Sequence, residues 1–158
     1  MLQKIKNRKE SGFTIIEVLI VLAIAGLILL VVFLAVPALQ RNSRNTQAKN
    51  AASAILGAVS EFSNNNGGQL PTTVAVAGNT VTFTGAAGTT QSTAKVQAGY
   101  TVSLGTTMPG ANVTGSFVVN TNHNCNNNAF STTTTPRAVS IGFNIENGSS
   151  TANQCVES

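Results

Sequence analysis

Residues 18–36 read VLIVLAIAGLILLVVFLAV and carry no charged side chain. At about 1.5 Å of rise per residue, a helix of this length extends roughly 28 Å, close to the hydrocarbon thickness of a bilayer. A helix that is apolar on every side needs lipid or a large protein interior around it, and the polar remainder of this chain is too small to supply that interior. The segment is therefore predicted to span a membrane.

Basic residues before this segment also fit the outline of a removable secretory signal. The apolar run is longer than a typical signal core, however, and Pro37-Ala38-Leu39-Gln40, which follows it, offers no small-x-small cleavage site. Four basic residues precede the segment and three follow it, which favours a cytoplasmic N-terminus. Two cysteines in the distal part favour an oxidising compartment for that part.

The composition changes near residue 63 from apolar to polar, and the polar part is rich in Ser, Thr, Asn and Gly. The chain has one His and no Asp or Trp, so no acid–base pair suggests an enzyme, and no phosphate or dinucleotide motif is present. Glu146 and Glu157 are interpreted as solvated surface residues. Four of the nine basic residues lie before Gly12, and the polar part has only two, so a nucleic-acid partner has no support.

The most specific pattern is a basic leader followed by Ser11-Gly12-Phe13-Thr14-Ile15-Ile16-Glu17. It closely resembles the class III signal of type IV pilins and pseudopilins. The resemblance implies that a membrane-embedded prepilin peptidase cuts between Gly12 and Phe13 and methylates the new amine of Phe13. Leader, junction, acid and apolar helix together are far more specific than any one of them.

Glu17 is an acid at the start of an apolar helix. A carboxylate in lipid costs on the order of 2.5–3.5 kcal/mol unless it is paired or reaches the interface. Cleavage would create an ammonium at Phe13, about one helical turn away, and the resemblance implies that this pair forms between neighbouring subunits. Such a pair can select one axial register during assembly. The alternative is that Glu17 lies among lipid headgroups without a specific role.

The resemblance implies an α+β fold of the pilin ladle type, in which the outer half of one long N-terminal helix packs on a C-terminal antiparallel sheet. Residues 1–12 are then the cleaved leader, and 13–39 form the membrane-spanning, filament-core half of the helix. Residues 40–63 form its amphipathic half, and 64–158 form a β-rich globular domain.

The helix is expected to run for about 50 residues, because apolar residues recur at three- and four-residue steps beyond the membrane segment. These positions are Ala48, Ala51, Ala52, Ile55, Leu56, Val59 and Phe62. Pro37 is expected to kink the helix, since it lacks a backbone donor and clashes with the preceding turn. In the commonest pilins the corresponding proline lies about three residues closer to the mature N-terminus.

Alternating residues predict an antiparallel sheet of four to six strands after the break at 64–68. Val74 and Val76 lead through Gly78-Asn79 to Val81 and Phe83, which is typical of a β-hairpin. Further strands are expected over 96–104, around 113–119 and over 139–145. The run 132–135 before Pro136 is interpreted as a loop or an edge strand.

Cys125 and Cys155 are predicted to form a disulfide, because they are a single pair in a domain with a thin apolar core. The bond would restrain the unfolded chain by about 3–4 kcal/mol. The resemblance implies that it closes a C-terminal region. A metal site of both cysteines and His123 is the alternative, but a fourth ligand is lacking. No metal or cofactor is expected.

The resulting hypothesis is a structural subunit, the major pilin, of a type IV pilus that serves adhesion, motility or uptake. Its expected partners are other copies of itself, prepilin peptidase, the assembly platform with its ATPase, and the membrane before assembly into an extracellular filament. A pseudopilin of a type II secretion system is an alternative. It is weakened because such proteins commonly bind calcium through Asp, and this chain has no Asp. Minor or DNA-uptake pilins are another. A surface enzyme with a plain signal anchor would leave Gly12, Phe13 and Glu17 unexplained.

Overall fold

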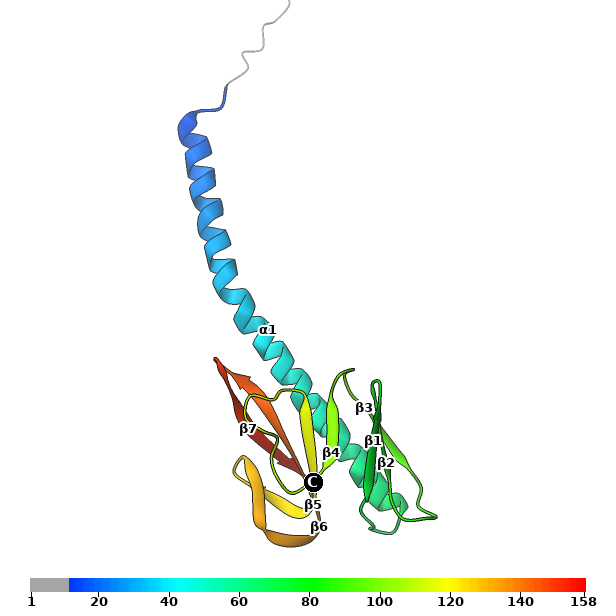
Figure 1. Ribbon diagram of the computed structural model, residues 1–158. Helices are drawn as coiled ribbons and strands as arrows, with labels where there is room; N and C mark the ends of the chain where they lie inside the picture. Colours follow the sequence, from blue (N-terminus) through cyan, green and yellow to red (C-terminus); the bar gives the residue numbers. More distant parts are fainter. Residues whose placement is uncertain (1–11) are drawn as a thin grey trace, which may run out of the picture. The chain divides into compact units, whose positions relative to one another are not determined.

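A computed structural model describes residues 12–158, so the basic residues and Ser11 of the predicted leader lie outside the described residues. The chain divides into two compact units, Met1–Gln40 and Arg41–Ser158. One long helix, α1, comes first and is followed by seven strands (Figure 1), which confirms the α+β class. The bounds are α1 Ile15–Asn65, β1 Thr73–Ala77, β2 Thr80–Thr84, β3 Ser92–Lys95, β4 Thr101–Leu104, β5 Ser116–Asn126, β6 Ala129–Asn147 and β7 Ser150–Glu157.

Helix α1 has 51 residues, close to the predicted length, and it contains Pro37. The bend expected at Pro37 stays a prediction, as do the domain limits. The helix ends where the sequence predicts a break, because Gly67 adopts a left-handed φ of 65° and the Gly68 N–H donates to the Ser63 carbonyl at 2.7 Å. This bond is the 6→1 contact of a Schellman motif, which supplies a donor to one of the carbonyls that the helix end leaves free.

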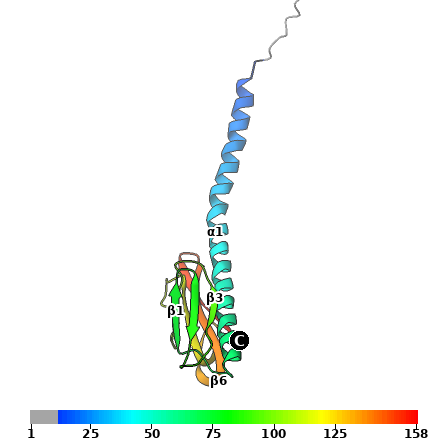
Figure 2. The same ribbon diagram turned by 90° about the vertical axis from the view of Figure 1, so that its right-hand side faces the viewer.

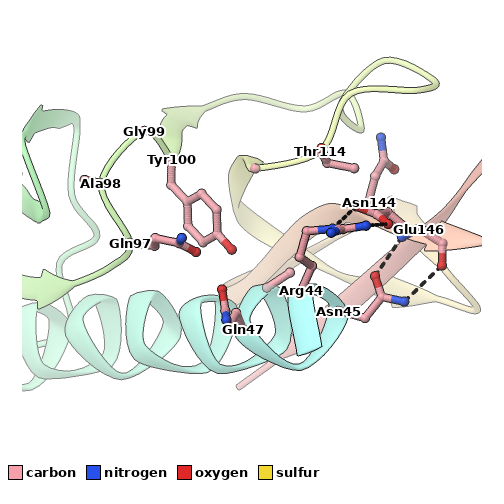
Figure 3. Close-up of a pocket in the computed structure, with 12 residues that line it drawn as sticks. Arg44, Asn45, Gln47, Gln97, Ala98, Gly99, Tyr100, Thr114, Asn144 and Glu146 are labelled. Carbon is pink, nitrogen blue, oxygen red and sulfur yellow. Dashed lines mark hydrogen bonds and ion pairs between the residues drawn. The ribbon is translucent and has the colours of Figure 1, made fainter. Parts of the chain in front are cut away.

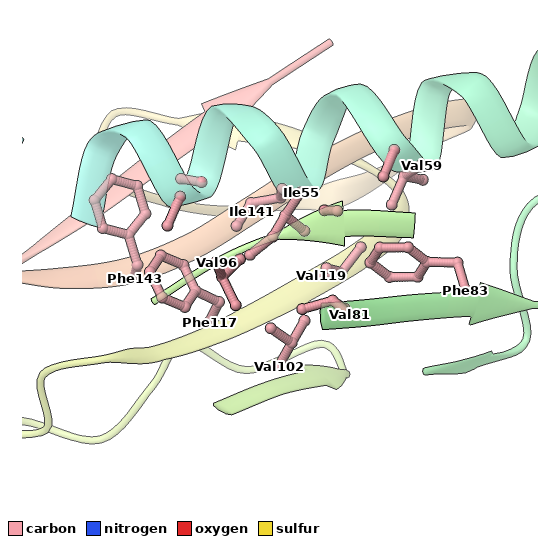
Figure 4. Packing of buried hydrophobic residues seen from close by; sticks show 14 of the residues in the cluster. Ile55, Val59, Val81, Phe83, Val96, Val102, Phe117, Val119, Ile141 and Phe143 are labelled. Carbon is pink, nitrogen blue, oxygen red and sulfur yellow. The ribbon is translucent and has the colours of Figure 1, made fainter. Parts of the chain in front are cut away.

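In the unit Arg41–Ser158, the C-terminal half of α1 lies over one face of the strands (Figure 2). The predicted apolar positions of this half are buried, except for Leu56, which is half-buried, and Ala58 joins them. Figure 4 shows Ile55 and Val59 of α1 facing buried side chains of the strands, and four phenylalanines are the largest fully buried side chains. The core residues on the strands include Val81, Phe83, Val102, Phe117, Val119, Ile141 and Phe143.

The strands form two sheets, not the single antiparallel sheet that the sequence predicts. One has the order β1-β2-β3 and the other β4-β5-β6-β7. The hairpin of β1 and β2 is confirmed, with Ala77 opposite Thr80 across the Gly78-Asn79 turn. Strands β4 and β5 are parallel. The antiparallel pairing predicted from the sequence is wrong for these two strands, because the connection 105–115 crosses over and returns the chain in the same direction.

The strand predicted over 96–104 is wrong, because its first half is a turn. Gly99 adopts a φ of 92°, the Tyr100 N–H donates to the Gln97 carbonyl at 3.2 Å, and Ala98 is exposed. The alternation of apolar residues over 96–104 therefore begins just after β3, continues through the turn and ends in β4, so it is not a single strand.

The tip of the β5–β6 hairpin folds back over the face of the second sheet that lies away from α1. The pairing shifts register between Thr121 and His123, and Arg137 on β6 has a φ of 67°. The threonines 132–135 lie inside β6, in the part before Ser140, where the pairing of β6 with β7 begins. Their expected edge character is therefore confirmed.

Gly142 allows this fold-back, because a Cβ there would lie 2.5 Å from Met108 Sδ and 2.8 Å from Phe130 Cζ. We expect Gly142→Ala to lower the free energy of unfolding by about 1–3 kcal/mol, since both side chains, which are partly buried, have to move away from the new methyl group. Gly57→Ala is the matched control, because nothing lies within 4 Å of that exposed helical site. It should stabilise by up to about 1 kcal/mol. Chemical denaturation of the detergent-solubilised protein checks both, and equal effects would contradict the packing argument.

Candidate functional site

The candidate site is the N-terminal segment, in which the helix begins directly after the predicted cleavage junction. Phe13 is 86% exposed, and the large apolar side chains from Ile15 to Leu39 are exposed along with it. Among the described residues, α1 is the one helix long and apolar enough to cross a membrane. The segment thus presents apolar side chains that nothing within its own unit covers, and lipid or other copies of the helix could cover them.

Thr14 and Glu17 form a capping box at the start of this helix. The Thr14 N–H and Oγ1 both donate to Glu17 Oε2, at 2.9 and 2.8 Å, while the Glu17 N–H donates to Thr14 Oγ1 at 3.4 Å. Each side chain therefore supplies a partner to backbone groups that lack one at a helix N-terminus. The carboxylate is held one residue away from the Phe13 nitrogen that cleavage would expose.

The helix is apolar and exposed, and an acid is held at its first turn. Together with the β-rich unit that follows, these features are typical of a subunit that is anchored in a membrane by its N-terminal helix. The comparison with known families agrees with this description. A family model described as the prokaryotic N-terminal methylation motif matches residues 7–33. This match supports a type IV pilin-like prepilin with a class III signal.

No curated protein and no solved structure matches the chain. The motif implies processing by prepilin peptidase and pilus assembly. Together with the apolar helix, it supports membrane anchoring before assembly into a surface filament. The family is one of structural pilin-type subunits.

Cys125 and Cys155 are joined by a disulfide in the structure, with Cα atoms 5.8 Å apart. The bond links the tip of the β5–β6 hairpin to β7, and the Cys125 N–H also donates to Glu157 Oε2. His123 Nδ1 instead lies 3.1 Å from the Thr121 carbonyl. Within residues 12–158, no cluster of three or more His, Cys, Asp or Glu residues could hold a metal ion.

We expect the double substitution Cys125→Ser, Cys155→Ser to lower the free energy of unfolding by about 3–4 kcal/mol. The loop between the cysteines regains its freedom in the unfolded chain, and the sequence separation of 30 sets that magnitude. Denaturation with and without reductant measures the effect, and only the wild-type protein should respond to reductant. Non-reducing peptide mapping of protein from the cell surface is the complementary test, and free thiols there would contradict the bond.

Arg44 and Asn45 of α1 clamp the helix to the end of β6 through Glu146 (Figure 3). Arg44 Nε and Nη2 donate to the two carboxylate oxygens at 2.6 and 2.7 Å. The Asn45 amide donates to the Glu146 carbonyl at 2.9 Å and accepts from its N–H at 2.8 Å. The interpretation of Glu146 as a merely solvated residue is therefore wrong, because its side chain is ion-paired and its backbone groups are bonded to Asn45.

The clamp lies beside a cavity of about 250 Å³ whose walls include Gln47, Gln97 and Tyr100. Burial raises the pKa of the Tyr100 hydroxyl. The pKa of Glu146 is lowered, first by the hydrogen bonds from Arg44 and then by the charges of Arg44 and Arg41. The carboxylate at the edge of this cavity therefore stays charged, and its charge is balanced by Arg44 of the same chain.

We expect Glu146→Gln to lower the thermal unfolding midpoint at neutral pH by at most about 4 °C, because a half-exposed ion pair contributes little. A lowered carboxyl pKa stabilises the fold above the pKa of the unfolded chain, about 4.3, and this contribution is lost as the pH falls through the folded-state pKa. The difference from wild type should therefore vanish in more acidic buffer. Glu61→Gln removes a carboxylate from an exposed helical position, and as the control it should leave the midpoint at neutral pH unchanged. A difference independent of pH would contradict the ion-pair account.

Proposed function

We propose that this prepilin is the major structural subunit of a type IV pilus and polymerises through its N-terminal helix. The observation that carries the proposal is the exposed apolar surface from Ile15 to Leu39, most of which lies within the methylation motif. Lipid covers such a surface before assembly, and neighbouring helices cover it in a filament core. Membrane helices associate through packing and a few polar contacts, because lipid provides no hydrophobic driving force between them.

The β-rich unit suits the outside of such a filament. Its sequence is rich in Ser, Thr and Asn, whose neutral polar side chains interact well with water, and its charges are few. Its thin core is supported by the apolar face of α1 and by the disulfide. An assembly platform and its ATPase would extract the anchored subunit from the membrane and add it to the filament.

The charged end of the helix gives a mechanism for register. Cleavage exposes an ammonium at Phe13, and Glu17 is the only charged side chain between Phe13 and Gln40. Pairing of the carboxylate with the amine of a neighbouring subunit would distinguish the correct axial offset along otherwise uniform apolar helices. In the uncut chain the carboxylate is already oriented toward this end by its bonds to Thr14.

The test is electron cryomicroscopy of filaments sheared from cells, at a resolution that identifies side chains. Density that fits this sequence from Phe13 onward along the whole filament would support the major-pilin proposal. A filament built of another chain would contradict it. Loss of secretion without loss of filaments on gene deletion would point instead to a pseudopilin, which carries the same motif.

A further inference from the structure

The sequence contains two Asn-Gly dipeptides, Asn66-Gly67 and Asn147-Gly148. In this pair the backbone nitrogen of the glycine can attack the side-chain amide carbon of the asparagine, because glycine has no side chain to hinder the approach. Both glycines have left-handed φ angles, 65° and 63°, and nothing lies within 4 Å of the Cβ position at either one. The glycines are therefore equivalent, and the environment of each asparagine decides its reactivity.

The side chain of Asn66 is fixed by three hydrogen bonds at the end of α1. Its Nδ2 donates to the Phe62 carbonyl at 2.8 Å and to the Thr90 carbonyl at 2.9 Å. Its Oδ1 accepts from the Thr90 N–H at 2.7 Å. Rotation of the amide toward Gly67 would break these bonds, and it would leave two backbone groups of Thr90 without their partner.

Asn147 is the exposed last residue of β6, directly before the two-residue turn Gly148-Ser149 that leads to β7. Its backbone is ordered, since it pairs with Ser150 and its carbonyl accepts from Ser150 Oγ at 3.1 Å. Its side-chain amide, in contrast, makes no hydrogen bond within residues 12–158. The amide can therefore rotate toward the Gly148 nitrogen without losing a contact.

We propose that Asn147 is a site of spontaneous deamidation and that the fold protects Asn66 from the same reaction. The Gly148 backbone nitrogen loses its proton and bonds to Asn147 Cγ, the Cγ–Nδ2 bond breaks, and ammonia leaves with that proton. Water then opens the five-membered succinimide ring at either carbonyl. The products are aspartate and isoaspartate, and water is the only co-reactant.

The product changes the molecule where α1 is clamped to the strands. A new carboxylate follows directly after Glu146, the partner of Arg44. Isoaspartate also routes the main chain through the former side chain and lengthens the turn by one carbon atom. The pairing between Asn147 and Ser150 cannot keep its geometry after that change. Chemical damage to the subunit therefore begins at this turn.

The experiment follows both dipeptides in detergent-solubilised full-length protein that is incubated in mildly alkaline buffer. Peptide mapping with electron-transfer fragmentation distinguishes asparagine, aspartate and isoaspartate at each position. We expect the Asn147 peptide to convert about tenfold faster than the Asn66 peptide or more, because the hydrogen bonds that hold Asn66 must break first. In protein denatured before incubation, the two rates should become similar.

Two variants make the test sharper. Asn147→Ser should remove most of the acidic charge variants that intact-protein analysis detects over the incubation, while Asn66→Ser should leave them in place. Equal rates at the two sites in folded protein would overturn the protection of Asn66. An unreacted Asn147 under conditions that convert the denatured chain would overturn the proposal as a whole.

Discussion

Gly12→Val is expected to abolish maturation almost completely and leave an uncut prepilin in the membrane. Nothing in the structure lies within 4 Å of a Cβ at Gly12, and its φ is not in the left-handed region. The substitution therefore costs the precursor nothing in its own fold. The loss arises in the peptidase, where a branched side chain at the cut site blocks the close approach that glycine allows.

Gly26→Val is the matched control, because Gly26 lies in α1 and nothing lies within 4 Å of its Cβ position either. It adds the same bulk to the same segment and should leave cleavage unchanged. Mass spectrometry of the N-terminal peptide decides the result. The wild-type and control proteins should begin at a methylated Phe13, and the Gly12→Val protein should keep its leader. A mature Phe13 terminus at wild-type abundance in Gly12→Val would remove Gly12 from the processing site.

The parts of the fold that the sequence predicts well depend on local patterns. The buried face of α1 follows from the three- and four-residue spacing around Ile55, and the β1–β2 hairpin follows from Gly78-Asn79 between two alternating runs. The division into two sheets was missed because it depends on Gly99 and on the crossover before β5. Neither feature changes the alternation of apolar residues from which the strands were inferred.

The contacts at the candidate site likewise include one that a local sequence pattern predicts and one that it does not. Thr14 could have been found, since Thr-x-x-Glu before an apolar run is the signature of a capping box. The clamp of Arg44 and Asn45 on Glu146 could not, because the two ends of the ion pair are 102 residues apart. Both ends lie in polar segments that have no periodicity to indicate a partner. Exposure was the reasonable expectation for Glu146 until the strands placed it beside α1.

Glu17→Gln is expected to reduce surface filaments by at least about tenfold, while processing and membrane abundance stay near wild type. The amide can still accept from Thr14 and complete the capping box, because Glu and Gln serve equally at that position. Only the negative charge is lost. If the charge sets subunit register by pairing with the Phe13 amine of a neighbour, its loss leaves apolar helices with no preferred axial offset.

Two further variants separate register from helix capping. Thr14→Val removes the hydroxyl of the capping box and keeps the charge, so filaments should persist at near wild-type number. Glu17→Val removes charge and cap together and replaces a costly acid with a residue suited to lipid, so membrane insertion should be equal or better and filaments should still be lost. Electron microscopy counts filaments, and immunoblotting of membranes confirms that each variant is processed and present. Normal filaments in Glu17→Gln together with their loss in Thr14→Val would assign Glu17 to helix capping, and the register mechanism would have to be abandoned.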